Sequence, residues 1–153
     1  MKLNNNKKIS FLDNNNLNNI QKLLKILEYL RDPEKGCAWD IKQTFSSISP
    51  YTIEEAYEVA QAIQDENFDD LREELGDLLL QVVFLSQIAN EKKLFCFDDV
   101  VNGIKEKLIR RHPHIFKENV NLKRWKRPVL LLGEKLHAVV DDDETGQALP
   151  RPG

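Results

Sequence analysis

Two groups of acidic residues stand out in this chain by their type and spacing. The first is Glu54-Glu55-Ala56-Tyr57-Glu58, and the second is Glu74-Leu75-Gly76-Asp77. Residues three or four positions apart lie on one face of an α-helix, so each group would place its carboxylates side by side. Two such faces brought together would crowd like charges, which a cation relieves. Oxygen ligands of this kind suit a hard divalent ion, Mg²⁺ or Mn²⁺.

Two solvated helix faces are the alternative interpretation of these carboxylates. In the first group the acids lie opposite the predicted buried side, which is the pattern of an ordinary amphipathic helix. That predicted buried side consists of Ile53, Ala56, Tyr57, Ala60 and Ile63. In the second group, Asp77 directly precedes the apolar run 78–85, where we expect a partly buried carboxylate that needs a partner. The first group favours solvated acids and the second favours a metal, so both interpretations stay open on the residues alone.

Other reactive constellations are missing from the sequence. The three histidines, His112, His114 and His137, do not form the Glu-x-x-His pairs of di-iron bundles. No Cys/His set fits structural zinc, and no glycine-rich segment fits a phosphate-binding loop. No Ser-His-Asp or Cys-His set is evident.

A basic segment is the candidate for phosphate binding. Lys107, Arg110 and Arg111 have the spacing of one helix face, and arginine matches phosphate oxygens well. Cations that stabilise a helix C-terminus are the alternative. Charge is also distributed unevenly, with ten acidic residues and one basic residue over 54–77, and nine basic and two acidic residues over 105–127. Trp39 and Trp125 could stack on a base, or Trp39 could fill the core.

The hydrophobic spacing predicts an all-α antiparallel helical bundle. We expect helices over about 16–30, 52–64, 67–90 and 98–111, with short loops between most of them. Thr52 to Glu55 has the sequence of a capping box and marks the predicted start of the second helix. We divide the chain into a flexible segment 1–16, a helical domain 17–118 and an irregular, partly disordered tail 119–153.

Length and composition bound the remaining possibilities. A chain of 153 residues is expected to form one domain with a real core. The net charge of −3 argues against a nucleic-acid partner. The two cysteines form no CxxC pair and fit a reduced, cytoplasmic setting. We see neither a signal peptide nor a segment long enough to cross a membrane.

Several segments in a fixed order resemble one family. They are Arg31-Asp32-Pro33-Glu34-Lys35-Gly36-Cys37-Ala38-Trp39-Asp40, Gln43-Thr44-Phe45, the EExxE and ExxD acidic groups, and Arg110-Arg111-His112-Pro113-His114. Together they are similar to the MazG-type nucleoside triphosphate pyrophosphohydrolases, and in particular to the N-terminal MazG domain. The likeness covers about residues 17–116.

The resemblance implies a fold, an activity and a set of site residues. It implies the all-α NTP pyrophosphatase fold, a homodimer, and Mg²⁺-dependent hydrolysis of nucleoside triphosphates to the monophosphate and pyrophosphate. It assigns the metal to Glu55, Glu58, Glu74 and Asp77, with Mn²⁺ as a second possible ion. It also implies that Glu54, Glu55 and Glu58 act in catalysis. Substrate contacts are implied for Lys107, Arg110, Arg111 and Trp125.

A second function is also compatible with this resemblance. Longer members of the family carry two copies of the domain, and the first copy can be less active. The alternative is therefore a catalytically weak or silent MazG-like module for dimerisation or regulation.

Overall fold

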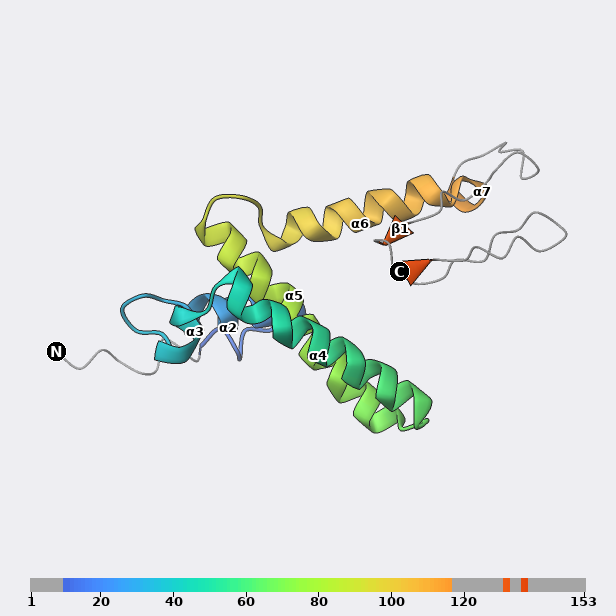
Figure 1. Ribbon diagram of the computed structural model, residues 1–153. Coiled ribbons are helices and arrows are strands. Elements are labelled where there is room, and N and C mark those ends of the chain that lie inside the picture. The colour runs from blue at the N-terminus through green and yellow to red at the C-terminus, as the bar shows by residue number, and fades with distance from the viewer. Residues whose placement is uncertain (1–9, 117–130, 133–135, 138–153) are drawn as a thin grey trace, which may run out of the picture. The chain divides into compact units, whose positions relative to one another are not determined.

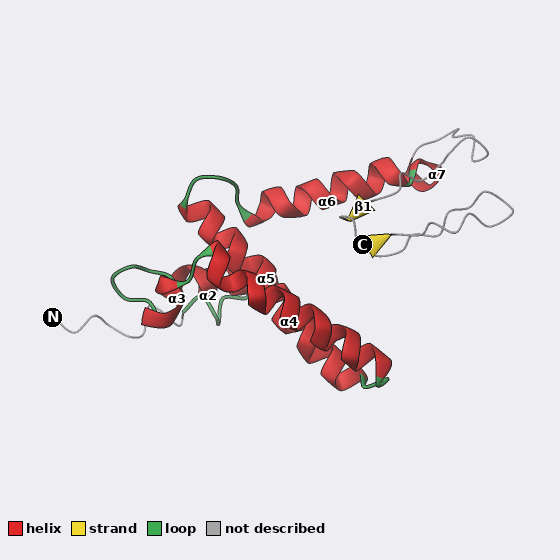
Figure 2. Cartoon of the chain, in the orientation of Figure 1, coloured by secondary structure: helices red, strands yellow, loops and turns green. Residues whose placement is uncertain are grey.

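The computed structural model describes residues 10–116, 131–132 and 136–137 of the chain. These residues belong to two compact units, which divide at residue 100. Except for two short strands in the second unit, the regular elements are helices (Figures 1 and 2). The predicted all-α antiparallel bundle is confirmed in the first unit. None of the described helices is long and apolar enough to span a membrane.

Helix α2 spans Asn19–Leu30 and begins at a capping box. The Asn18 side chain accepts from the Gln21 backbone N–H at 2.9 Å, and the Gln21 side chain accepts from the Asn18 N–H at 2.9 Å. The predicted end at Leu30 is confirmed. Before the helix, the Phe11 ring stacks on Tyr29 with centroids 5.2 Å apart.

The start of the second predicted helix is corrected by the structure. A short helix α3 spans Ala38–Lys42, and α4 spans Phe45–Gln64, so α4 begins before the predicted capping box. The capping residues are Thr44 and Ser47, which exchange hydrogen bonds of 2.8 and 3.2 Å. Pro50 lies inside the helix rather than at its boundary. The helix begins earlier because Thr44 caps it. Pro50 is tolerated inside the helix because the carbonyl of Ser46, which its missing N–H would have bonded, belongs to an exposed residue.

Helix α5 spans Phe68–Glu91 and forms an antiparallel hairpin with α4 (Figure 1). At the hairpin turn the Asn67 N–H donates to the Ala62 carbonyl at 3.1 Å, and the Glu66 N–H donates to Ile63 at 3.2 Å. Glu66 adopts a left-handed φ of 52°. These features form a Schellman motif, which closes the carboxyl end of α4 and reverses the chain within three residues.

The core lies where α2 packs against one end of this hairpin. Its buried members come from α2, α4 and α5: Leu27, Ile48, Val83, Phe84 and Ile88. Burial of each large apolar side chain contributes about 1.5–3 kcal/mol. The core therefore holds three helices together and leaves the rest of the hairpin as a two-helix structure.

Two more helices and a pair of short strands complete the described elements. Helix α6 spans Phe97–Arg111, close to its predicted bounds, and α7 spans Pro113–Phe116. Strands β1 (Leu131–Leu132) and β2 (Leu136–His137) pair antiparallel, with Leu131 opposite His137. These strands were not predicted from the sequence.

Candidate metal centre

The buried stripe of α4 is not the one predicted from its apolar residues. Ile53, Tyr57 and Ile63 are exposed by 58%, 73% and 57%. The inward stripe follows alternating steps of four and three residues, the spacing of a helix–helix seam. It contains the buried and half-buried residues of α4 from its second turn onward: Ile48, Thr52, Glu55, Val59 and Ala62. Glu55 therefore lies in the seam between α4 and α5, where apolar residues usually pack.

Helix α5 presents a matching stripe with the same spacing. Its buried and half-buried members are Leu71, Glu74, Leu78, Gln81, Leu85 and Ile88. Glu74 is the carboxylate of this stripe, as Glu55 is of α4. The two seam positions bring carboxylates from separate helices toward one another, which the predicted amphipathic pattern did not reveal.

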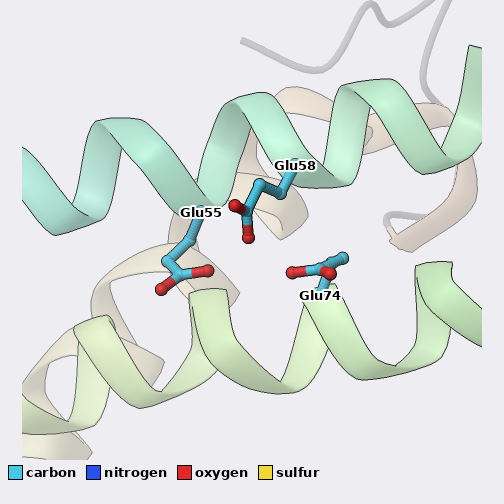
Figure 3. Close-up of side chains that lie close together, drawn as sticks. All are labelled: Glu55, Glu58 and Glu74. Atoms are coloured by element: carbon cyan, nitrogen blue, oxygen red, sulfur yellow. The ribbon is translucent and has the colours of Figure 1, made fainter.

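Glu55, Glu58 and Glu74 form a compact group between the two helices (Figure 3). Each residue offers a carboxylate oxygen within 4.8 Å of those of the other two. Glu55 and Glu74 are half-buried, whereas Glu58 is exposed. Three of the four predicted metal ligands are thus brought together by the hairpin.

The environment disfavours the charged form of two of these residues. Burial is the largest cause that raises the pKa of Glu55, followed by the charges of Asp77, Glu58 and Glu54. Burial also leads the causes that raise the pKa of Glu74, followed by hydrogen bonding with Glu58 and by neighbouring charges. Crowded carboxylates in a partly dry seam therefore hold their protons more tightly than free ones.

One carboxylate oxygen of the group has no hydrogen-bond partner among the residues that the structure describes. Glu55 Oε2 is shielded from solvent and makes no hydrogen bond with the described residues. A buried carboxylate oxygen without a partner is costly, and coordination to a cation would satisfy it. The donor set consists only of carboxylate oxygens, which fits Mg²⁺ or Mn²⁺ and does not fit a soft metal. The residues present therefore fit a hard divalent ion.

Asp77 and Glu54 lie beside this group. Asp77 is exposed, so the expectation that it is partly buried is wrong; the half-buried acid of its helix is Glu74. Its charge nevertheless raises the pKa of both Glu55 and Glu74, which places it in their electrostatic neighbourhood. Glu54 is exposed and acts on Glu55 in the same way.

A small acidic pocket continues from the group toward the hairpin turn. It encloses about 220 Å³. Glu58 and Glu74 belong both to the carboxylate group and to the lining of this pocket. The other lining residues are Gln61, Ala62, Asp65 and Asp70. The Asp65 side chain accepts from Gln61 at 2.9 Å, and Asp70 accepts from Asn67 at 2.5 Å. These two acids already have hydrogen-bond partners among the described residues, whereas Glu55 Oε2 has none.

The predicted phosphate-binding residues lie near the end of α6. Lys107 and Arg111 are half-buried, and Arg110 is exposed. Arg111 Nε is shielded from solvent and has no hydrogen-bond partner among the described residues. A buried guanidinium nitrogen without an acceptor is suited to an anion. Trp125, the fourth predicted substrate contact, lies outside the described residues.

Trp39 is placed on the surface and not in the core. It is 53% exposed, and its ring meets Tyr51 edge-on with centroids 6.3 Å apart. The possibility that Trp39 fills the core is therefore wrong. Tyr51 precedes Glu55 by one helical turn of α4, so the aromatic pair and the carboxylates are near each other along one helix.

The sequence of residues 43–116 matches the model of the MazG nucleotide pyrophosphohydrolase domain. This range of the chain is therefore a MazG domain by its match to the family model. The matched range contains all four predicted metal ligands and the basic end of α6. It ends at the last residue of α7.

Curated relatives of this domain are similar to it in sequence. The chain is 57% identical over 103 residues to a nucleoside triphosphate pyrophosphohydrolase of Escherichia coli, a match that covers 67% of this chain and 39% of the relative. It is 52% identical over 108 residues to the nucleoside triphosphate pyrophosphohydrolase/pyrophosphatase MazG of Thermotoga maritima, covering 69% and 42%. The chain thus spans about two fifths of the length of these relatives.

A solved structure supports the fold of the MazG domain. The crystal structure of a MazG-related protein from Thermotoga maritima aligns with a TM-score of 0.55 and 27% identity. The alignment covers 66% of this chain and 86% of that chain. The predicted fold type is therefore confirmed, while the roles of individual site residues stay predictions.

Proposed function

We propose that this MazG domain hydrolyses nucleoside triphosphates to nucleoside monophosphate and pyrophosphate in a reaction that depends on Mg²⁺. One observation carries the proposal: Glu55, Glu58 and Glu74 converge within 4.8 Å from two helices. Two of the three occupy seam positions, where uncompensated charge is costly. The names of the Escherichia coli and Thermotoga relatives support the same reaction class.

The proposed metal ligands are Glu55, Glu58, Glu74 and Asp77, and Mn²⁺ is compatible with the same oxygens. When bound, the ion would neutralise phosphate charge and lower the pKa of a coordinated water. Asp77 would complete the set by a rotation of its exposed side chain toward the group.

The chain's own residues would divide the remaining work. Water attacks the α-phosphorus, the bond from this phosphorus to the bridging oxygen breaks, and pyrophosphate leaves. Glu54, which is exposed beside Glu55, would accept the proton that the water loses. Lys107, Arg110 and Arg111 would bind the phosphates through charge-assisted hydrogen bonds. Trp39 and Trp125 are the candidates for stacking on the base.

A homodimer is part of the proposal because apolar side chains are left without cover. The outer face of α4 exposes Ile53, Tyr57 and Ile63. One face of α5 exposes Phe68, Leu75, Leu79 and Val82 by 37–74%. Exposed apolar side chains grouped on helix faces are typical of an interface, and a second copy of the chain would bury them.

The direct test measures pyrophosphate release from a panel of nucleoside triphosphates with Mg²⁺. Wild type is compared with Glu58→Gln and Asp77→Asn, which keep side-chain shape and remove one charge each. We expect release by the wild type and strong loss in both variants. Equal release by all three proteins would refute the metal assignment. A folded wild type that binds Mg²⁺ and releases nothing would favour a silent dimerisation or regulatory module.

A further inference from the structure

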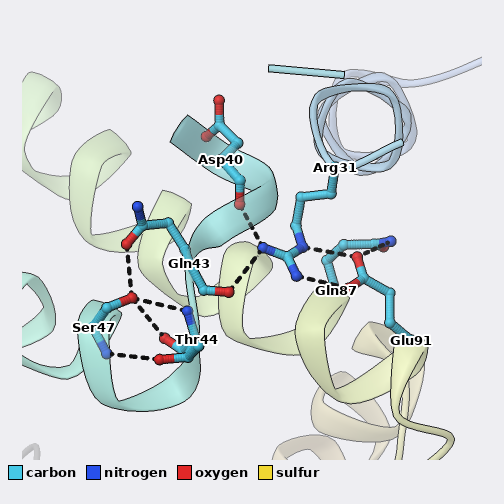
Figure 4. Close-up of polar contacts among 7 residues, drawn as sticks. All are labelled: Arg31, Asp40, Gln43, Thr44, Ser47, Gln87 and Glu91. Carbon is cyan, nitrogen blue, oxygen red and sulfur yellow. Dashed lines mark hydrogen bonds and ion pairs between the residues drawn. The ribbon is translucent and has the colours of Figure 1, made fainter. Parts of the chain in front are cut away.

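Arg31 is a buried cation outside the metal centre. It is the residue that follows α2, and its side chain is only 7% exposed. Two parallel hydrogen bonds join it to Glu91 at the end of α5: Nε donates to Oε1 at 2.8 Å, and an Nη donates to Oε2 at 2.7 Å (Figure 4). The guanidinium also lies 5.5 Å from the ring centre of buried Phe84.

The other side of the same guanidinium binds the end of α3, next to the N-cap of α4. The second Nη donates to the carbonyl oxygens of Asp40 at 2.6 Å and Gln43 at 3.2 Å (Figure 4). Gln43 immediately precedes Thr44, the N-cap of α4. Arg31 therefore connects the last turn of α5 to α3 and to the residue before the N-cap of α4 through one planar group.

Gln43 extends this connection into both α3 and α4. Its side-chain amide donates to the Trp39 carbonyl at 3.0 Å, and its side-chain oxygen accepts from the Ser47 hydroxyl at 2.7 Å. A shift of Gln43 would therefore move the cap of α4 and the end of α3 together. Arg31 therefore contacts a segment whose backbone and side chains are hydrogen-bonded to α3 and to the cap of α4.

The hairpin of α4 and α5 is thereby fixed at both ends. The Schellman motif at Glu66 closes one end, and Arg31 with Glu91 closes the other. Glu55 and Glu58 lie in the middle of α4, between these two points. A slide of α4 by one residue changes axial positions by about 1.5 Å. Metal and catalytic groups tolerate only about 0.5 Å of such displacement.

We propose that Arg31 is a positioning residue that sets the axial register of α4 on α5, and thereby the convergence of Glu55 and Glu58 with Glu74. The inference rests on the proposed metal centre. It assigns a positioning role to a residue that contacts none of the proposed ligands. Buried ion pairs contribute little to stability, and fixing register is their best-attested role. Lysine could not replace this arginine, because four hydrogen bonds in two directions require the guanidinium plane.

The test measures Mn²⁺ affinity by electron paramagnetic resonance, because binding is read without turnover. Arg31→Lys and Arg31→Gln are compared with wild type at a temperature where circular dichroism shows every protein fully folded. Arg72→Lys and Arg72→Gln are matched controls, since Arg72 pairs with Asp69 at 3.4 Å on the exposed surface of α5. Glu91→Gln keeps Arg31 in place and weakens the same connection, so it serves if the Arg31 variants do not fold.

We expect Mn²⁺ affinity to fall by about tenfold in both Arg31 variants and in Glu91→Gln, and to stay unchanged in both Arg72 variants. Unchanged affinity in folded Arg31 variants, even with a lower Tm, would overturn the proposal and leave Arg31 a purely structural residue. A wild type that binds no Mn²⁺ would overturn the metal centre and this inference together. A wild type that binds Mn²⁺ without turnover would refute the proposed reaction alone, and the variants would still decide the role of Arg31.

Discussion

Glu55 on α4 and Glu74 on α5 approach each other across the helix seam, with carboxylate oxygens within 4.8 Å. Both residues occupy positions of the four-and-three spacing that packs the two helices together. The same steps that bury Ile48 and Ala62 on α4 also bring Glu55 inward. The proposed metal centre is therefore built into the packing of the hairpin.

Removal of one carboxylate from the seam should raise stability and lower activity. In Glu74→Gln the amide can donate to Glu58, so we expect a higher Tm than wild type without metal. The Mg²⁺-dependent rise in Tm should disappear, and pyrophosphate release should fall by at least about 100-fold. Differential scanning calorimetry with EDTA or Mg²⁺ checks the first two effects. Glu73→Gln removes the same charge from an exposed neighbour and should keep the Mg²⁺ response; loss of that response there would contradict the assignment.

The pH dependence of the metal-free protein should carry the signature of this crowding. The pKa values of Glu55 and Glu74 are raised above 4.5, so the folded chain binds more protons than the unfolded chain between 4.5 and the raised values. Stability should therefore fall as pH rises through this window. The lowered pKa of Glu91 acts in the opposite direction.

A comparison of variants isolates the crowded pair, because the effect of Glu91 is common to both proteins. We expect a Glu55→Gln, Glu74→Gln double variant to gain stability over wild type in EDTA as pH rises toward neutral. The gain should shrink on acidification. A gain that is independent of pH would show that titration of this pair does not govern stability. Mg²⁺ should reverse the wild-type trend, because the ion binds the ionised carboxylates.

Much of this architecture follows from the sequence, and the exceptions have physical causes. Helical spacing correctly predicted the end of α2 and the extent of α5, because one apolar side of each packs within the chain. On α4 the same rule chose Ile53 and Tyr57 as buried, yet both are exposed. Hydrophobic spacing shows that a helix face is suited to burial. It does not show whether the same chain or a second copy buries that face.

The site shows the same division between what spacing reveals and what it hides. The acidic groups and their helices were predictable from residues three and four apart. The greater burial of Glu74 compared with Asp77 could not be predicted in this way. Burial of these acids is set by their position in the helix–helix seam and not by apolar neighbours in the sequence. The signal that was missed is the stripe Ile48, Thr52, Glu55, Val59 and Ala62, which places a carboxylate in register with packed residues.

The exposed stripe of α4 should control self-association. Ile53→Asp places a charge on a surface that we propose is buried between two copies, so we expect a shift toward monomer by at least about tenfold in dissociation constant. Sedimentation equilibrium measures this change. Ile53→Leu keeps the surface apolar and should associate like wild type. If wild type is monomeric throughout the accessible concentration range, the proposed homodimer is wrong.

Gly36 should tolerate no side chain, because the backbone folds closely around it. Its N–H donates to the Asp32 carbonyl at 2.8 Å, and the next N–H, of Cys37, donates to Leu30 at 2.8 Å. A Cβ at this position would collide with the Leu30 carbonyl oxygen and lie 2.6 Å from that of Asp32. These are backbone atoms, so the turn itself must shift, and Gly36→Ala should cost about 1–3 kcal/mol of unfolding free energy.

A second glycine-to-alanine substitution provides a control with the opposite expected effect on stability. A Cβ at Gly103 of α6 would meet no atom of the described residues within 4 Å, so Gly103→Ala should stabilise the helix by about 0.5–1 kcal/mol. Urea unfolding of both variants measures the two effects on one scale. Because the Gly36 turn directly follows Arg31, Gly36→Ala should also weaken Mn²⁺ binding, whereas Gly103→Ala should not. Equal and small effects of the two substitutions on stability would contradict the close packing of the turn.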